Sequence, residues 1–88
     1  MEFYAYVEVK MALIRKFNRK PQRERMSAHG VIEADYIPFE RDGRVLLQID
    51  TYGSKGRQNP GKQSQTIQLD RDSASQLFII LKQEFGFD

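Results

Sequence analysis

The stretch VLLQIDTYG (45–53), SKGRQNPGK (54–62), QSQTIQLD (63–70) and RDSASQLFIILKQEFGF (71–87) decides the fold of this chain. Its first and third parts alternate apolar and polar residues with a period of two, which predicts strands. The part between them is rich in glycine and cations, which predicts a loop. The last part repeats its apolar residues at helical spacing. The order is therefore strand, long polar loop, strand, helix.

The predicted helix has clear ends and more than one apolar face. Asp70 is the predicted N-cap, and Gly86 is placed to end the helix. Ile80 flanks the main apolar stripe, and Ile79 lies near the opposite face. We therefore expect the helix to be covered by its own sheet and by another chain. Ile79 and Ile80 are the predicted dimer contacts.

The sequence before Val45 adds further strands. Residues 3–13 alternate cleanly, and residues 31–40 form a second strand candidate, in which Pro38 indicates a bulge or an edge. Residues 41–44, Arg-Asp-Gly-Arg, predict a tight hairpin turn. In the strand that follows, Val45, Leu47 and Ile49 are expected to face the core, and Gln48, Asp50 and Tyr52 to face outward. The predicted fold class is α+β: a curved antiparallel sheet of three to four strands, arranged as a meander, followed by one C-terminal α-helix.

The length of 88 residues predicts one domain, 1–88. Within it, 1–14 is an extra N-terminal strand, 15–30 a basic linker and 31–88 the β-β-β-α core. Met26 is a plausible alternative start. A chain this short buries a limited core, so oligomerisation is expected.

Charge is distributed unevenly along the chain. Residues 1–30 hold seven Lys/Arg against three Glu, whereas residues 31–88 hold seven against nine acidic residues. The net charge of +2 thus arises from the run 15–25, which could contact nucleic-acid phosphates. The absence of cysteine is compatible with a cytoplasmic location. No apolar run approaches the roughly 20 residues of a membrane span.

The segment Gly56–Lys62 matches the first seven positions of a phosphate-binding P-loop. That motif requires Ser or Thr next, followed by a helix. Gln63 stands there instead, and a strand pattern follows, so the interpretation as a hairpin loop is favoured. His29 has no cysteine or suitably spaced carboxylate as a co-ligand. Since no nucleophile motif is present either, we expect no enzymatic activity, catalytic residue, metal or cofactor.

The same loop can attract anions, because its cations lie among glycines whose backbone N–H groups can approach phosphate. Tyr52 borders this loop and could stack on a base. The predicted nucleic-acid-binding residues are Arg44, Tyr52, Lys55, Arg57 and Lys62.

The order of features over about residues 31–88 resembles the positive-cofactor-four family of transcriptional coactivators and its small bacterial relatives. The matching residues are Gly43–Leu47, Ile49, Tyr52, Pro60–Lys62, Ile67 and Leu69. The resemblance implies a curved sheet and one helix, dimerisation through the helix, and binding of single-stranded nucleic acid, DNA rather than RNA. It also implies that Arg44 and Lys62 contact phosphates and that Tyr52 lies beside the stacking surface.

The chain departs from that family at two positions. Asp50 stands where the family tends to place a cation, and Gly53 stands where a further aromatic residue is common. The chain is also similar to small bacterial proteins with an Ile-Asp-Thr-Tyr-Gly-Ser core, here residues 49–54.

Two functional hypotheses follow. The first is a homodimeric single-stranded DNA-binding module that serves transcription or DNA metabolism. The second is a non-enzymatic protein-interaction or regulatory module, which is favoured by the net acidic charge of residues 31–88.

Overall fold

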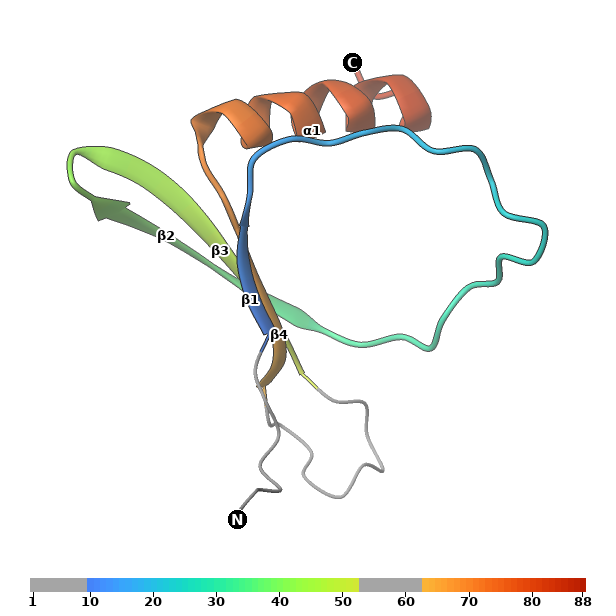
Figure 1. The fold of residues 1–88 in the computed structure, drawn as a ribbon, viewed down its shortest axis with the longest axis horizontal. Helices are drawn as coiled ribbons and strands as arrows, with labels where there is room; N and C mark the ends of the chain where they lie inside the picture. The colour runs from blue at the N-terminus through green and yellow to red at the C-terminus, as the bar shows by residue number, and fades with distance from the viewer. Residues whose placement is uncertain (1–9, 53–62) are drawn as a thin grey trace, which may run out of the picture.

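The computed structural model describes residues 10–52 and 63–88 (Figure 1). Residues 3–9 of the predicted N-terminal strand lie outside these ranges. The elements are β1 (Lys10–Ile14), β2 (Ala34–Arg41), β3 (Arg44–Tyr52), β4 (Gln63–Leu69) and α1 (Arg71–Phe85). The predicted α+β class, with strands followed by one C-terminal helix, is confirmed.

The sheet is mixed, so the prediction of a wholly antiparallel meander was wrong. Its order is β1-β4-β3-β2, in which β1 runs parallel to β4 and the other neighbours are antiparallel. The cause is the long segment 15–33, which leaves β1, runs beside α1 and returns to β2 in a wide arc (Figure 1). A connection of this length lets β1 and β2 occupy opposite edges of the sheet and point the same way.

The β2–β3 hairpin closes at the predicted turn. Asp42 and Gly43 have φ angles of 55° and 75°, as a two-residue turn of type I′ requires. The turn sets the register, in which Arg41 pairs with Arg44 and Phe39 with Leu46. Pro38 lies on the edge strand β2, where its missing N–H costs the sheet no hydrogen bond.

Both predicted ends of the helix are confirmed. The Asp70 side chain accepts a hydrogen bond from the Ser73 backbone N–H (2.9 Å), and the Ser73 hydroxyl accepts one from the Asp70 N–H (3.0 Å). The Ser73 N–H is the main reason that the pKa of Asp70 lies below its ordinary value. Gly86 adopts a φ of 74° and donates its N–H to the Lys82 carbonyl, which closes the last turn.

Strand register and side-chain alternation divide the sheet into two faces. The polar face carries hydrogen-bonding residues in its centre; it consists of Met11, Leu13, Asp35, Ile37, Phe39, Arg41, Leu46, Gln48, Asp50, Tyr52, Thr66 and Gln68. The apolar face consists of Ala12, Ile14, Tyr36, Pro38, Val45, Leu47, Ile49, Ile67 and Leu69.

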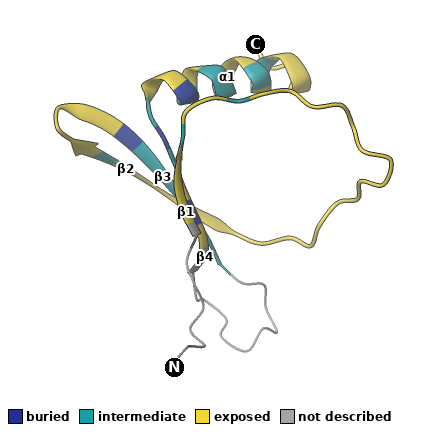
Figure 2. Cartoon of the chain, viewed as in Figure 1, coloured by how far each residue is buried: buried dark blue, intermediate teal, exposed yellow. Residues whose placement is uncertain are grey.

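Burial does not follow the predicted inward and outward pattern. Asp50, which was predicted to face solvent, is 7% exposed, whereas Val45, which was predicted to face the core, is 64% exposed. Among the described residues only two large apolar side chains, Leu46 and Leu69, are buried, and most of the ribbon is exposed in Figure 2. The reason is that the apolar face lacks the cover that the sequence pattern anticipates.

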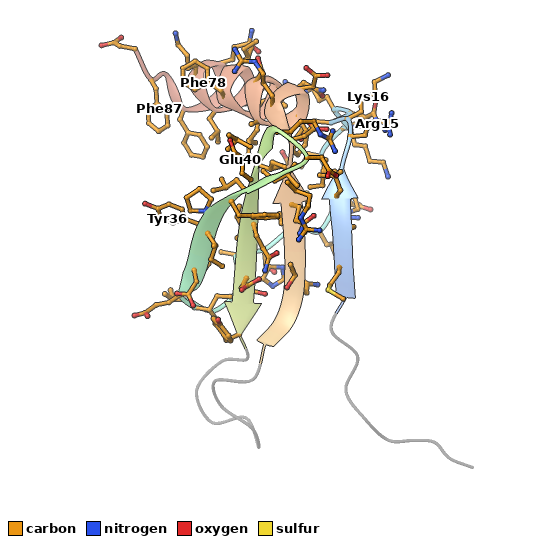
Figure 3. All side chains as sticks on the ribbon, turned by 90° about the vertical axis from the view of Figure 1, so that its left-hand side faces the viewer. Arg15, Lys16, Tyr36, Glu40, Phe78 and Phe87 are labelled. Atoms are coloured by element: carbon orange, nitrogen blue, oxygen red, sulfur yellow. The ribbon has the colours of Figure 1, made fainter. Side chains whose placement is uncertain are left out.

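The helix leaves its own apolar stripe open as well. It touches the sheet mainly at the end of β4, and Phe78, Phe85 and Ile79 remain 60%, 69% and 50% exposed. In the view of Figure 3, Phe78 on the helix and Tyr36 on β2 project toward the same side of the molecule. The chain exposes 8153 Å², against about 5,400 Å² for a compact monomer of its mass.

The capping hydrogen bonds give a first prediction. Ser73→Ala should lower the free energy of unfolding by about 1 kcal/mol, because the fully buried hydroxyl no longer accepts the Asp70 N–H. Chemical denaturation followed by circular dichroism measures this loss. Ser75→Ala, at an exposed position of the same helix, is the control and should leave the stability nearly unchanged. Equal effects of the two substitutions would contradict the role of the cap.

Candidate nucleic-acid interface

The predicted binding residues do not meet at one point in the described structure. Arg44 begins β3 and Tyr52 ends it, which separates them by about 27 Å at the usual rise of a strand. Lys55, Arg57 and Lys62 lie outside the described residues. A ligand that contacted both Arg44 and Tyr52 would have to be an extended one.

Tyr52 is held by an acidic neighbour. Its hydroxyl donates a 2.8 Å hydrogen bond to the Asp35 carboxylate. That bond is the main reason that the pKa of Tyr52 is raised, and the charges of Asp35 and Asp50 add to it. Two carboxylates beside the phenol also disfavour a phosphate at this end of the polar face.

A chain of hydrogen bonds crosses the centre of the polar face. The buried Asp50 Oδ1 accepts from the Thr66 hydroxyl (2.9 Å) and from the Gln48 amide nitrogen (3.0 Å). The Gln48 Oε1 in turn accepts from the Gln68 Nε2 (3.0 Å). A buried carboxylate needs such donors, because leaving it without them would carry the full cost of removing it from water.

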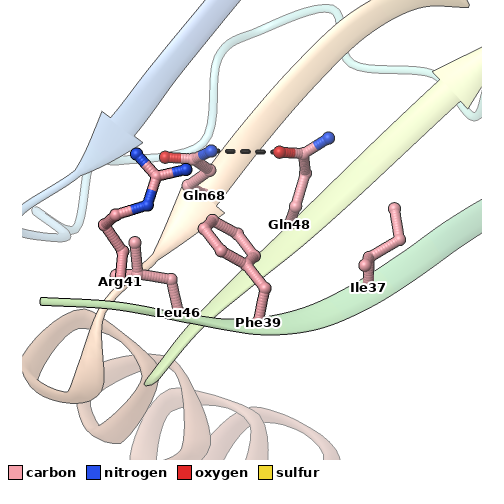
Figure 4. Close-up of a pocket in the computed structure, with 6 residues that line it drawn as sticks. All are labelled: Ile37, Phe39, Arg41, Leu46, Gln48 and Gln68. Carbon is pink, nitrogen blue, oxygen red and sulfur yellow. Dashed lines mark hydrogen bonds between the residues drawn. The ribbon is translucent and has the colours of Figure 1, made fainter. Parts of the chain in front are cut away.

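This chain of hydrogen bonds fixes the orientation of the Gln48 and Gln68 side-chain amides. An ionised carboxylate only accepts, so Gln48 must present its NH₂ group to Asp50 and its oxygen to Gln68. Gln68 must then present its own NH₂ group to Gln48. The Gln68 carbonyl oxygen consequently faces away from Gln48 and lies on the side of Arg41 (Figure 4).

A groove of about 390 Å³ lies beside the two glutamines (Figure 4). It is lined by Ile37, Phe39, Arg41, Leu46, Gln48 and Gln68. Phe39 forms its wall on β2, and Arg41 extends toward Gln68. The groove thus combines an aromatic ring, a cation and two amides, without a carboxylate among its lining residues.

A second cleft, of about 380 Å³, separates the hairpin turn from the start of α1. Arg44 and Arg71 line it together with Asp70 and Asp72. The positive charge of Arg44 makes a small contribution to the lowered pKa of Asp70. The charges in this cleft balance, so it offers an anion little net attraction.

The basic arm, residues 15–25, follows the helix. The Phe17 N–H donates to the Gln76 Oε1 (2.9 Å), and the Gln76 Nε2 donates to the Arg15 carbonyl (3.2 Å). Arg19 also pairs with Glu84 at 2.7 Å, in an exposed position. Lys16, Lys20, Arg23 and Arg25 are all exposed. The side chain of Gln76 therefore holds the beginning of the basic arm against α1.

The described residues give little support for a metal site, a P-loop or a membrane-spanning helix. No group of three or more His, Cys, Asp or Glu residues that could hold a metal occurs within the described ranges. Gly56–Gly61 and Lys62 lie outside them, but Gln63 begins β4 rather than a helix, which argues against P-loop chemistry. None of the helices within the described ranges has the length and apolar character needed to cross a membrane.

Comparison with known proteins returned no match to any family model, curated protein or solved structure.

None of the six groove residues was among the binding residues predicted from the sequence. Arg41 was interpreted as a turn residue, because it belongs to the Arg-Asp-Gly-Arg segment 41–44. A usable signal was present in the Asp42-Gly43 turn. It fixes the pairs Phe39–Leu46 and Ile37–Gln48, so Phe39 could have been placed on the same face as Gln48.

The Tyr52–Asp35 hydrogen bond predicts a specific pH dependence. Tyr52 should ionise above the ordinary value of 10.0, and Asp35→Asn should bring its pKa back toward that value. The stabilisation from this bond is complete below pH 10.0 and is lost as the pH rises through the raised pKa of the folded state. Tyrosinate absorbance, with NMR to assign the residue, measures the shift.

Glu40→Gln is the matched control, because Glu40 lies on the same strand with its side chain on the opposite face. An unchanged Tyr52 titration in Asp35→Asn would show that the hydrogen bond is absent in solution.

Proposed function

We propose that this chain forms a homodimeric module that binds single-stranded nucleic acid, DNA in preference to RNA, without enzymatic activity. It would act in the cytoplasm as an accessory factor in transcription or DNA metabolism. The observation that carries the proposal is the exposed basic arm, held against α1 by Gln76. Extended runs of cations bind phosphate backbones by releasing counterions. The resemblance to the positive-cofactor-four family supports the same function.

The polar face supports this proposal in a second way. The Asp50 carboxylate, which stands where the resembled family tends to place a cation, is 7% exposed and accepts two hydrogen bonds on one oxygen. Little of this carboxylate is therefore accessible to a ligand. Arg41 stands at the other end of the same face, in a groove without a carboxylate among its lining residues, where a phosphate would be attracted.

Uncovered apolar surface supports the homodimer. The apolar face and the helical stripe are both open, and exposed apolar patches of this kind mark interaction surfaces. Pairing through the edge of β2 is disfavoured by Pro38. We infer that the helix of one copy, including Ile79 and Ile80, covers the apolar face of the other. This arrangement leaves the polar face free for nucleic acid.

The central test is a titration of a labelled single-stranded DNA of about 20 nucleotides at two salt concentrations. Binding should weaken steeply with salt, and the triple variant Lys20→Gln, Arg23→Gln, Arg25→Gln should lower the salt slope by about 2, at about 0.7 per phosphate contact. A triple substitution is preferable to truncation at Met26, because truncation removes β1 from the sheet. Absence of binding at low salt would refute the proposal.

The dimer has its own test. Ile79→Asp should convert the dimer to monomer, because a charge would be buried in the interface. Sedimentation equilibrium or light scattering measures the mass. Ser27→Asp, at an exposed position of the segment 15–33 outside the helix, introduces the same charge away from the proposed interface and should remain dimeric. A wild-type chain that is monomeric at high micromolar concentration would contradict the arrangement.

The alternative is a protein-interaction module. The open apolar face and helical stripe favour it, since large exposed apolar patches mark interaction surfaces. Failure to bind DNA, together with an Ile79→Asp variant that loses a protein partner, would select this function.

A further inference from the structure

We propose that the groove beside Phe39, Gln48 and Gln68 receives one unstacked base of a single-stranded nucleic acid. This inference rests on the proposed function and assigns a base-reading position that lies away from Tyr52. The groove volume of about 390 Å³ falls within the range of about 300–1,000 Å³ that is usual for small-molecule sites.

The aromatic wall supplies the first element of recognition. Phe39 is half-buried, and its ring lines the groove on the polar face. Aromatic side chains on open sheets bind bases by stacking, which tolerates any base because each has a flat π-face. Ile37 and Leu46 continue the apolar surface on either side.

The amides supply the second element. Because Asp50 fixes Gln48 and Gln48 fixes Gln68, the Gln68 carbonyl oxygen is held as an acceptor before any ligand arrives. Arg41 extends toward the same place and brings several N–H donors (Figure 4). The Gln68 acceptor and the Arg41 N–H donors together match the edge of a base, which presents both hydrogen-bond donors and acceptors.

The distribution of charge favours a base in the groove rather than at the Tyr52 end of β3. The groove has no carboxylate among its lining residues, and Arg44 pairs with Arg41 across the hairpin. The Tyr52 end carries Asp35 and Asp50. A nucleotide in the groove would therefore place its phosphate near Arg41 and its base against Phe39.

The experiment compares two fluorescein-labelled strands of 20 nucleotides, one of mixed sequence and one that is abasic throughout. The full chain is used, as wild type and as Phe39→Leu, which keeps apolar bulk but removes the ring. Phe39→Leu should weaken binding of the mixed strand about 5-fold or more, from the loss of one stacked base. It should leave binding of the abasic strand and the salt slope unchanged.

Gln68→Met provides a second, independent variant, similar in size but without the amide. It should also weaken binding of the mixed strand and not of the abasic strand. If circular dichroism shows that Phe39→Leu is unfolded, Gln68→Met decides the question. Phe87→Leu, an exposed aromatic residue beyond the helix, is the matched control and should bind both strands as wild type does.

The outcomes separate this inference from the proposed function. If wild type binds the mixed strand and both groove variants bind it equally well, the base site is refuted while the nucleic-acid function stands. Equal binding of the abasic and mixed strands by wild type also refutes the base site. If wild type binds neither strand at low salt, both proposals fail.

Discussion

The buried carboxylate of Asp50 is the constraint on which the polar face of this protein depends. Placed on the central strand β3 and largely removed from water, it must keep hydrogen-bond donors around it. Thr66 and Gln48 supply them, and Gln48 in turn orients Gln68. Asp50, an acidic residue on a face proposed to bind an anion, thus orients the neighbouring amides while little of its own carboxylate is exposed.

The opposite face is governed by a different constraint, the small size of the chain. A single helix that touches the sheet mainly at the end of β4 cannot cover the apolar residues of four strands. Hydrophobic burial contributes most of the stability of a domain, so the open apolar face leaves part of that stabilisation unused in the single chain. Association of two copies would complete the core, and it would couple the stability of the protein to its concentration.

Local features of the fold were predictable because each depends on nearby residues. The Asp42-Gly43 turn, the Asp70 cap and the Gly86 stop are decided by backbone conformation and by hydrogen bonds over a few positions. The candidate site was less predictable. Arg44 and Tyr52 were chosen from the sequence, yet they lie at opposite ends of one strand, while Phe39 and Gln68 come together only through strand pairing.

The sequence by itself determined the elements, their order and the ends of the helix, because period, capping and turn chemistry act locally. Only the tertiary structure decided that β1 joins β4 in parallel, that Asp50 is buried and that Phe39, Arg41 and Gln68 share one groove. The physical reason is that these features depend on pairing between strands distant in sequence. From sequence alone, a polar residue on a strand is predicted to face solvent, because its cross-strand neighbours are not known.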